Sequence, residues 1–220
     1  ASCRIIAVIC VSREVGPVVP RGLSVMPKLI EKLLSLDGRV CPWWLAWTFD
    51  NPLRKWFQDP ERILGSLVRD GMVVADIGCG MGYYSVAMGR MVGPAGRVLS
   101  VDLQEKMLQY LEKRAVRAGV QDRIITTLGE PDDIKITGSQ VDFVLAFWMV
   151  HEVKDIPRFF GQVEKALKPT GSMLCVEPRM HVSPRRFEEI LGYAKSAGFV
   201  VSDGPKVGMS RSAVLEKAQA

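Results

Sequence analysis

The chain has 220 residues, of which 48% are apolar and 24% are charged, and its formal net charge is +5. This length and composition suit one globular domain with a substantial core, which argues against extended disorder. The longest apolar run near the N-terminus, residues 5–11, is far shorter than the roughly 20 residues of a membrane-spanning helix. It also lacks a small-x-small cleavage site, so we expect no signal peptide, no membrane insertion and a cytoplasmic location.

The basic excess and the cysteines exclude further classes of protein. Basic residues mostly alternate with acidic ones, as in 105–106, 112–114 and 185–189, which is typical of solvated helix faces. We therefore expect no nucleic-acid partner. The five cysteines are scattered without a Cys-x-x-Cys pair, and only two histidines are present. Neither a disulfide framework nor a metal site is predicted.

The first 70 residues differ in pattern from the rest. Residues 1–25 contain turn-forming glycines and prolines without clear periodicity, so we expect a loosely ordered extension. Residues 26–70 begin with a helical spacing of apolar residues and continue into an aromatic stretch that holds Trp43, Trp44 and Trp47. This stretch is either a helix buried against the sheet or a lid over an apolar acceptor pocket. We favour the lid, because so many tryptophans exceed what one packing face needs.

Strands and helices alternate from Val73 onward, which predicts parallel strands with helices on both faces of a sheet. Ser183 and Pro184 have the pattern of a helix start, and Gly198 has that of its end. Two further short strands then complete a domain over residues 71–220. The expected strands are 73–77, 97–101, 123–128, 141–147, 172–177, 199–202 and 212–216, and the expected helices are 83–92, 104–118, 155–167 and 183–198.

The most informative stretch is 73–82, where an apolar, acid-containing run leads into three alternating glycines, Gly78, Gly80 and Gly82. Glycines at this spacing allow a tight strand-to-helix turn, and a ligand can lie directly on their backbone. Asp102 follows 20 residues after Gly82, at the end of a second apolar run. A carboxylate there can accept hydrogen bonds from both hydroxyls of a ribose. The pattern therefore predicts a nucleoside-binding βαβ unit.

The acid beside the glycines indicates which nucleoside is bound. The dinucleotide pattern Gly-x-Gly-x-x-Gly fails here, because Tyr83 or Ser85 stands at its third glycine. Asp76 would repel a pyrophosphate but attract an ammonium or sulfonium group. S-adenosylmethionine carries an adenosine and both cations and has no phosphate. We therefore predict S-adenosylmethionine, rather than NAD, as the cofactor.

Five segments follow one another at a recognisable spacing. They are residues 76–82, 98–102, 128–133, 141–147 and 167–172, the last with Thr170 in place of a glycine. Over about residues 60–218 the chain resembles class I S-adenosylmethionine-dependent methyltransferases, close to the ubiquinone/menaquinone C-methyltransferase-like (methyltransferase type 11/31-like) group. The resemblance implies an α/β fold with a doubly wound, mainly parallel, seven-stranded Rossmann-like sheet. It also implies an antiparallel C-terminal hairpin at the sheet edge and an N-terminal helical lid.

The same resemblance implies a set of cofactor-binding residues around the carboxyl ends of the strands. Glu130 occupies a position where a carboxylate often lies near the adenine amino group, and Asp132 and Asp133 compete for that role. The predicted cofactor-binding residues are Asp76, Gly78, Cys79, Gly80, Gly82, Asp102, Leu103, Glu130, Ala146 and Phe147.

The end of the fourth strand narrows the chemistry. Ala146, Phe147 and Trp148 cannot supply the acidic magnesium ligands of metal-assisted O-methyltransferases. The Asn/Asp-Pro-Pro motif of amino-methyltransferases that act on DNA or protein glutamine is also absent. Both absences favour metal-free, in-line transfer, in which the protein mainly aligns the reactants and excludes water. His151 is either a general base or a structural histidine of the loop.

The predicted function is that of a methyltransferase that uses S-adenosylmethionine to methylate a small, partly apolar acceptor. One alternative is an RNA or protein methyltransferase. Another is a non-catalytic protein of the same fold that only binds the cofactor. The presence of Asp76, the three glycines and Asp102 argues against the non-catalytic alternative.

Overall fold

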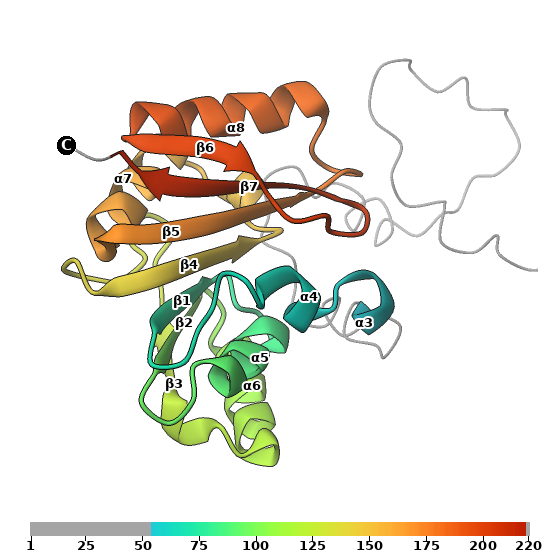
Figure 1. The fold of residues 1–220 in the computed structure, drawn as a ribbon, viewed down its shortest axis with the longest axis vertical. Helices are drawn as coiled ribbons and strands as arrows, with labels where there is room; N and C mark the ends of the chain where they lie inside the picture. The colour runs from blue at the N-terminus through green and yellow to red at the C-terminus, as the bar shows by residue number, and fades with distance from the viewer. Residues whose placement is uncertain (1–53, 219–220) are drawn as a thin grey trace, which may run out of the picture. The chain divides into compact units, whose positions relative to one another are not determined.

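The computed structural model describes residues 54–218, which form a seven-stranded sheet with the order β3-β2-β1-β4-β5-β7-β6 (Figure 1). The strands are β1 (Val73–Ile77), β2 (Arg97–Asp102), β3 (Ile124–Leu128), β4 (Val141–Phe147), β5 (Leu167–Pro178), β6 (Phe199–Asp203) and β7 (Ser210–Lys217). The helices are α3 (Arg54–Phe57), α4 (Pro60–Leu64), α5 (Tyr83–Met91), α6 (Glu105–Ala118), α7 (Ile156–Ala166) and α8 (Pro184–Ser196), with short 3-10 turns η1 (Gln121–Arg123) and η2 (Val150–Glu152).

The direction of the strands places the candidate site. β1 to β5 run parallel, whereas β7 lies antiparallel between β5 and β6. β2 pairs with one edge of β1, and β3 pairs with the outer edge of β2. β4 then pairs with the other edge of β1. Doubly wound sheets bind ligands outside the carboxyl ends of their strands, at the point where the strand order reverses. Here that point lies between β1 and β4, and the predicted α/β fold with a C-terminal hairpin is confirmed.

Helices cover both faces of the sheet because both sets of alternate strand residues are apolar (Figure 1). In β4, Phe143 and Leu145 are fully buried in one cluster with Met88 of α5. Val144 belongs to the opposite cluster, which holds Phe160 of α7 and further residues of α8. A strand buried on both faces is fixed in position, so its carboxyl end is a rigid support for a site.

β5 begins at Leu167, earlier than the residue 172 that the sequence predicts, so the fifth family-like segment, 167–172, lies inside this strand. Leu167 is fully buried and pairs with Val141, and the register shifts between Val141 and Phe143. Gly171 permits this close approach, because a Cβ there would lie 3.0 Å from the carbonyl oxygen of Val141. Burial of Leu167 therefore extends the strand across a segment whose Lys-Pro-Thr-Gly sequence is typical of a turn.

The part of the predicted lid region that the structure describes lies beside the carboxyl ends of the strands. The Gly208 amide donates a hydrogen bond of 3.1 Å to the carbonyl of Phe57 in α3. Gly208 precedes β7, whose first residue, Ser210, pairs with Pro178 at the carboxyl end of β5. α3 is thus tied to the edge of the sheet where a ligand is expected.

The remaining N-terminal predictions fall outside the described residues. These are the extension over residues 1–25 and the tryptophans Trp43, Trp44 and Trp47 of the lid. Among the helices of residues 54–218, none has the length and apolarity needed to cross a lipid bilayer.

Candidate active site

The three glycines after β1 form an open turn with left-handed backbone. Their φ angles are 73° at Gly78, 53° at Gly80 and 79° at Gly82, values that favour glycine. A Cβ at Gly82 would lie 2.1 Å from the Leu111 side chain, and one at Gly78 would lie 2.9 Å from the Cβ of Met149. A Cβ at Gly80 would meet nothing within 4 Å. The outer glycines are therefore required by packing, and the middle one faces open space where a ligand can lie.

Asp102, at the end of β2, lies against this turn. Its Oδ2 accepts a hydrogen bond of 2.9 Å from the Gly80 amide, and its Oδ1 accepts one of 2.9 Å from the Gln104 amide. Burial raises the pKa of the Asp102 carboxyl, and these amide donors partly oppose the rise. Each carboxylate oxygen has further acceptor capacity, which suits a pair of ribose hydroxyls. The neighbouring Leu103 is 40% exposed and offers apolar surface beside them.

Asp76, in β1, is a buried carboxyl group that lacks an ion-pair contact among the described residues. Its side chain is 2% exposed, and its Oδ2 accepts a hydrogen bond of 2.5 Å from the Ser85 hydroxyl. Burial, together with the negative charge of Asp102, raises the pKa of Asp76 to about 7, although the Ser85 hydrogen bond and the Arg54 charge oppose the rise. An anionic Asp76 would be stabilised by a cation placed beside it.

An aromatic cage next to Asp76 already holds a cation. The guanidinium carbon of Arg54 lies 4.3 Å from the ring centroid of Tyr83, 5.4 Å from that of Tyr84 and 5.9 Å from that of Phe147. Aromatic faces at these distances attract organic cations, with ammonium ligands as a known case. The residues present therefore fit a ligand that carries a sulfonium and an ammonium group above an open glycine turn.

The end of β4 closes the cage from the other side. Ala146 is fully buried, and the Phe147 ring lies 4.4 Å from the Tyr84 ring and 5.5 Å from the Trp148 ring, centroid to centroid. Trp148 has a φ of 60°, which is uncommon for a bulky residue. Its indole donates a hydrogen bond of 2.9 Å to the Ser210 hydroxyl, which holds this strained turn against β7.

Cys79 is a packing residue within the glycine turn. It is 8% exposed and belongs to the cluster that contains Leu111 of α6. Burial, with the negative charges of Asp76 and Asp102, raises the pKa of the Cys79 thiol well above its ordinary value. The thiol is therefore neutral and packs in the apolar cluster.

The acidic loop after β3 lies beside Asp102 but points its carboxylates to solvent. The Gly129 amide donates a hydrogen bond of 2.9 Å to the Asp102 carbonyl, so the loop is attached to the end of β2. Glu130 is exposed, and its Oε1 lies 2.7 Å from Lys135 Nζ, which also pairs with Asp133. Asp132 pairs with Arg158 of α7 at 3.4 Å. All three candidate acids are thus engaged in surface ion pairs, and the adenine contact of Glu130 stays a prediction.

A second polar group lies at the carboxyl ends of β4 and β5. Glu177 is fully buried, and its Oε1 accepts a hydrogen bond of 2.9 Å from the Val150 amide. Its Oε2 accepts a short hydrogen bond from Nδ1 of His151, and the His181 ring stacks on His151 with centroids 5.9 Å apart. Burial lowers the pKa of His151, but the hydrogen bond and the charge of Glu177 outweigh it and raise the pKa.

The structure brings most of the predicted residues to one edge of the sheet. Asp76, the glycines, Cys79, Asp102 and Leu103 surround the ends of β1 and β2, and Ala146 and Phe147 end β4. Sequence reasoning missed Arg54 and Glu177. Glu177 had a usable signal, because it is an acid at the end of a buried apolar strand, as Asp102 is.

Comparison with known proteins agrees with this geometry. Residues 74–171 match a family model described as a methyltransferase domain. The match covers somewhat less than half of the chain, and it supports the predicted resemblance to class I S-adenosylmethionine-dependent methyltransferases. It also supports the predicted enzyme class and S-adenosylmethionine as the cofactor.

The curated relatives include demethylmenaquinone methyltransferases. The protein from Symbiobacterium thermophilum is 30% identical over 123 residues, which cover 56% of this chain and 48% of the relative. The protein from Lactobacillus johnsonii is 26% identical over 117 residues, which cover 53% of this chain and 48% of the relative. The chain therefore spans about half the length of these curated relatives.

Solved structures share the fold. A SAM-dependent methyltransferase from Aquifex aeolicus has a TM-score of 0.72 at 23% identity, with 82% of this chain and 100% of that chain covered. A putative S-adenosyl-L-methionine-dependent methyltransferase from Methanococcus maripaludis has a TM-score of 0.67 at 16% identity, with 83% and 97% covered. At these identities the likeness concerns the architecture of the methyltransferase fold.

The glycine turn gives a paired prediction. Alanine at either Gly80 or Gly82 must adopt left-handed backbone, which costs about 1–2 kcal/mol. Gly82→Ala also drives a methyl group into Leu111, so its melting temperature should fall further than that of Gly80→Ala. Gly80→Ala should instead raise the Kd for S-adenosylmethionine by about tenfold or more, because its methyl group enters the ligand space. Thermal unfolding measures the melting temperatures, and calorimetry measures the Kd values. An unchanged Kd in Gly80→Ala would contradict this placement of the ligand.

The buried Asp76 predicts a pH dependence of cofactor binding. Because its pKa is about 7, Asp76 is mostly protonated at pH 6 and mostly charged at pH 7.5. The affinity for S-adenosylmethionine should therefore rise roughly eightfold between these pH values. Asp76→Asn should bind more weakly and lose this dependence, whereas Asp122→Asn, an exposed control on η1, should keep it. Calorimetry measures the Kd for S-adenosylmethionine at both pH values. The same change of Kd with pH in the wild type and both variants would disprove the role of Asp76.

Proposed function

We propose that the protein transfers the methyl group of S-adenosylmethionine to a small, partly apolar acceptor by in-line, metal-free substitution. The observation that carries the proposal is the aromatic cage beside Asp76, which already contacts the Arg54 guanidinium and includes Tyr83, the residue directly after the glycine turn. This arrangement suits an organic cation at one end of the cofactor. Asp102, at the neighbouring strand end, suits the ribose at the other end.

The side chains of this site hold and orient the reactants. S-adenosylmethionine supplies a methyl group that is already activated on a sulfonium, so no Lewis acid is needed. Asp102 would fix the ribose, and Asp76 with the rings of Tyr84 and Phe147 would fix the cationic end. Ala146 and Phe147 offer no oxygen ligand for magnesium at the end of β4, which supports metal-free transfer. Alignment and exclusion of water then supply most of the rate enhancement.

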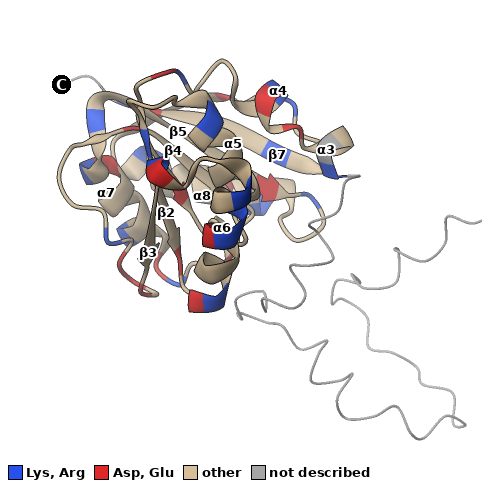
Figure 2. Cartoon of the chain, turned by 90° about the horizontal axis from the view of Figure 1, so that it is seen from below, with Lys and Arg blue, Asp and Glu red and all other residues tan. Residues whose placement is uncertain are grey.

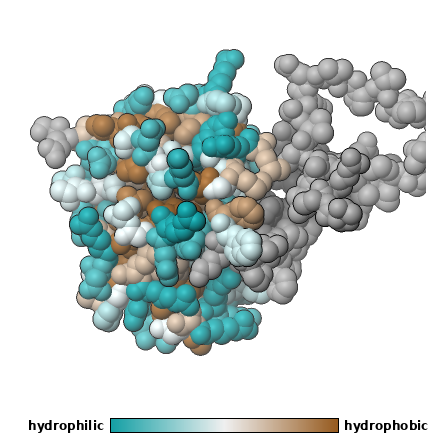
Figure 3. Space-filling view, turned by 45° about the vertical axis from the view of Figure 1, so that its right-hand side comes forward, coloured by the Kyte–Doolittle hydropathy of each residue, from teal (hydrophilic) through white to brown (hydrophobic). Residues whose placement is uncertain are grey.

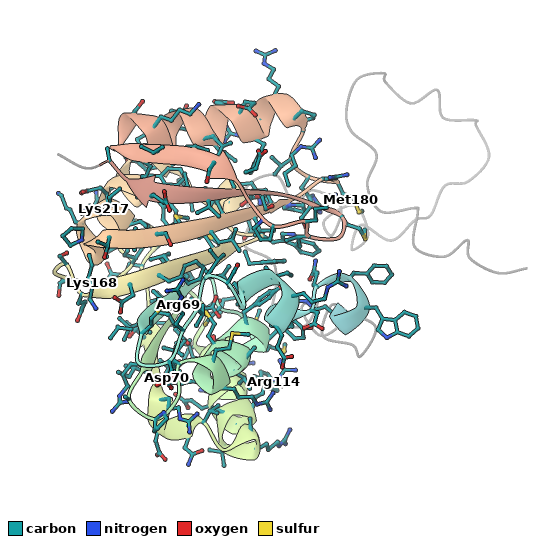
Figure 4. The ribbon with its side chains drawn as sticks, viewed as in Figure 1. Arg69, Asp70, Arg114, Lys168, Met180 and Lys217 are labelled. Atoms are coloured by element: carbon teal, nitrogen blue, oxygen red, sulfur yellow. The ribbon has the colours of Figure 1, made fainter. Side chains whose placement is uncertain are left out.

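The surroundings of the site support an apolar acceptor. Phe57, Met180 and Met209 are each more than half exposed. Met180 lies just beyond the carboxyl end of β5 (Figure 4). They come from neighbouring segments, because Gly208 bonds the Phe57 carbonyl and the Arg179 amide bonds the Met209 carbonyl at 2.9 Å. We call these three residues the apolar rim. In the space-filling view, apolar residues reach the surface between hydrophilic ones (Figure 3).

The names of the curated relatives suggest the acceptor to try first. Those relatives are demethylmenaquinone methyltransferases, so a demethylated naphthoquinol is the first probe for the apolar rim. The distribution of charge gives less support to an RNA substrate. Lys and Arg lie interspersed with Asp and Glu on the described helices, α6 among them (Figure 2). An RNA-binding face would be expected to gather basic residues.

Cofactor binding is the first experiment. Calorimetry should detect S-adenosylmethionine and S-adenosylhomocysteine and no comparable affinity for NAD. Asp102→Ala should lose about 1–3 kcal/mol of binding free energy, since the ribose hydroxyls lose their acceptor. Asp122→Ala, a change of the same kind on exposed η1, should bind like the wild type. Tighter binding of NAD, or equal affinities in the two variants, would refute the proposed cofactor site.

Acceptor transfer is the second experiment. Methyl-labelled S-adenosylmethionine should label a short-chain demethylated naphthoquinol in preference to total RNA or to protein. Met180→Ser should raise the acceptor KM several-fold, because less apolar surface is buried on binding. Val116→Ser, which alters an exposed apolar residue of α6, should leave the KM unchanged. Preferential labelling of RNA or protein would support the alternative substrates, and binding without any transfer would support a non-catalytic protein.

A further inference from the structure

Glu177 is a buried carboxyl group that cofactor binding does not use. It stands at the carboxyl end of β5, two strands away from β1 across the sheet, and its side chain is fully buried. A buried carboxylate is unfavourable unless hydrogen-bond donors surround it. Glu177 has two such donors, the Val150 amide at 2.9 Å and Nδ1 of His151. Both belong to the turn after β4, so Glu177 fixes that turn.

The hydrogen bond from Nδ1 determines what the other ring nitrogen can do. When Nδ1 carries the proton and donates to Glu177, Nε2 of neutral His151 has a free lone pair. The nearest acid to Nε2 within the described residues is Glu152, whose Oε1 lies 4.0 Å away, beyond hydrogen-bonding distance. The His151 side chain is 20% exposed, so Nε2 can meet a ligand. This is the arrangement of a carboxylate-oriented imidazole base.

Contacts of nearby residues link His151 to both parts of the proposed site. Met149, two residues before His151, packs against Gly78 of the cofactor turn. His151 also stacks on His181, which follows Met180 of the apolar rim. Nε2 is therefore the candidate base for an acceptor held between the apolar rim and the cofactor turn.

We propose that His151 accepts a proton from the methyl acceptor and that Glu177 is the positioning residue that holds its ring in the productive tautomer. The acceptor is then a compound whose nucleophilic atom carries an ionisable hydrogen, such as a phenol, an enol or an enolisable C–H acid. The inference rests on the proposed function and adds the acceptor's chemical class to it.

The transfer step balances with these groups. The bond between the acceptor atom and its hydrogen breaks, and its electron pair forms the new bond to the methyl carbon. The pair of the sulfur–methyl bond stays on sulfur, which becomes a neutral thioether. The proton goes to Nε2 of His151, and the Glu177 carboxylate stabilises the imidazolium that results. The proton later leaves to water. A tertiary amine or a thioether has no such hydrogen and would gain nothing from this base.

Several charged groups face His151 and set its pH dependence. Burial favours the neutral ring, whereas Glu177 of β5 and Glu152 of η2 favour the imidazolium, and Arg186 of α8 opposes it. His181 is held more neutral by burial and by the nearby His151 charge. The outcome is a raised pKa for His151. The rate should therefore increase with pH through a midpoint above the ordinary histidine value of about 6.5.

An NMR titration tests the pair without any acceptor. The chain has only two histidines, so His181→Asn assigns both imidazole signals. With S-adenosylhomocysteine bound, His151 should titrate above pH 6.5 and show the Nδ1–H tautomer when neutral. Glu177→Gln should lower that midpoint by about one unit or more, and Glu216→Gln, an exposed control on β7, should leave it unchanged. An unshifted midpoint in Glu177→Gln would overturn the positioning role.

A rate profile with the demethylated naphthoquinol tests the base. His151→Gln should lower kcat about a hundredfold or more while the calorimetric Kd for S-adenosylmethionine stays the same. Glu177→Gln should lower kcat and move the midpoint of the pH–rate profile downward. Glu177→Asp, which keeps a carboxylate, should have a midpoint between those of the wild type and Glu177→Gln. A lower melting temperature with an unchanged midpoint would mean a structural role only and would refute the inference. These outcomes can be distinguished from failure of the proposed function. In that case the wild type itself would fail to bind the cofactor or to transfer methyl groups.

Discussion

Burial of negative charge at the carboxyl edge of the sheet is the constraint around which the rest of this protein is arranged. Asp76, Asp102 and Glu177 end or nearly end three apolar strands, and each is at most 8% exposed. Desolvated carboxylates need donors or cations, and each acid here has a different set. Asp102 has backbone amides, Glu177 has a histidine and an amide, and Asp76 has a hydroxyl and a nearby guanidinium.

The different donors give the three acids different chemistry. Backbone amides cannot move away, so Asp102 is fixed as an acceptor for neutral hydroxyl groups. Within the described residues, Asp76 has hydrogen-bond donors from Ser85 alone, so its ionised form keeps excess negative charge and favours a cationic partner. The imidazole beside Glu177 can gain and lose a proton, so this acid is linked to proton transfer. A parallel sheet buried on both faces makes these differences possible, because it holds the strand ends rigidly in place.

The sequence predicted the features that depend on local spacing. The strands around β1 and β2, the glycine turn and Asp102 follow from apolar runs, glycine spacing and the distance between two strand ends. The early start of β5 could not be read in this way, because burial of Leu167 overrides the turn tendency of the residues that follow it. Lys135, which pairs with Glu130, has a φ of 56° in an irregular loop, and no periodic pattern predicts it.

The pairs that join distant segments were the hardest to predict. Glu177 and His151 are 26 positions apart, and they meet only because β4 and β5 are neighbours whose ends coincide. Arg54 contacts the cage from α3, and the hydrogen bond between Gly208 and Phe57 ties that helix to the segment before β7. Such contacts depend on tertiary packing, and a single sequence contains no periodicity that reports them.

If S-adenosylmethionine binds as proposed, the guanidinium of Arg54 makes cofactor binding an exchange of cations. The cationic end of the cofactor would use the same aromatic faces as the guanidinium, so it would enter as the guanidinium leaves. The desolvation of a cation and the partial neutralisation of Asp76 are then largely present before the ligand arrives. The affinity would consequently be a difference between two similar interactions, and the position of α3 would be thermodynamically linked to occupancy of the site.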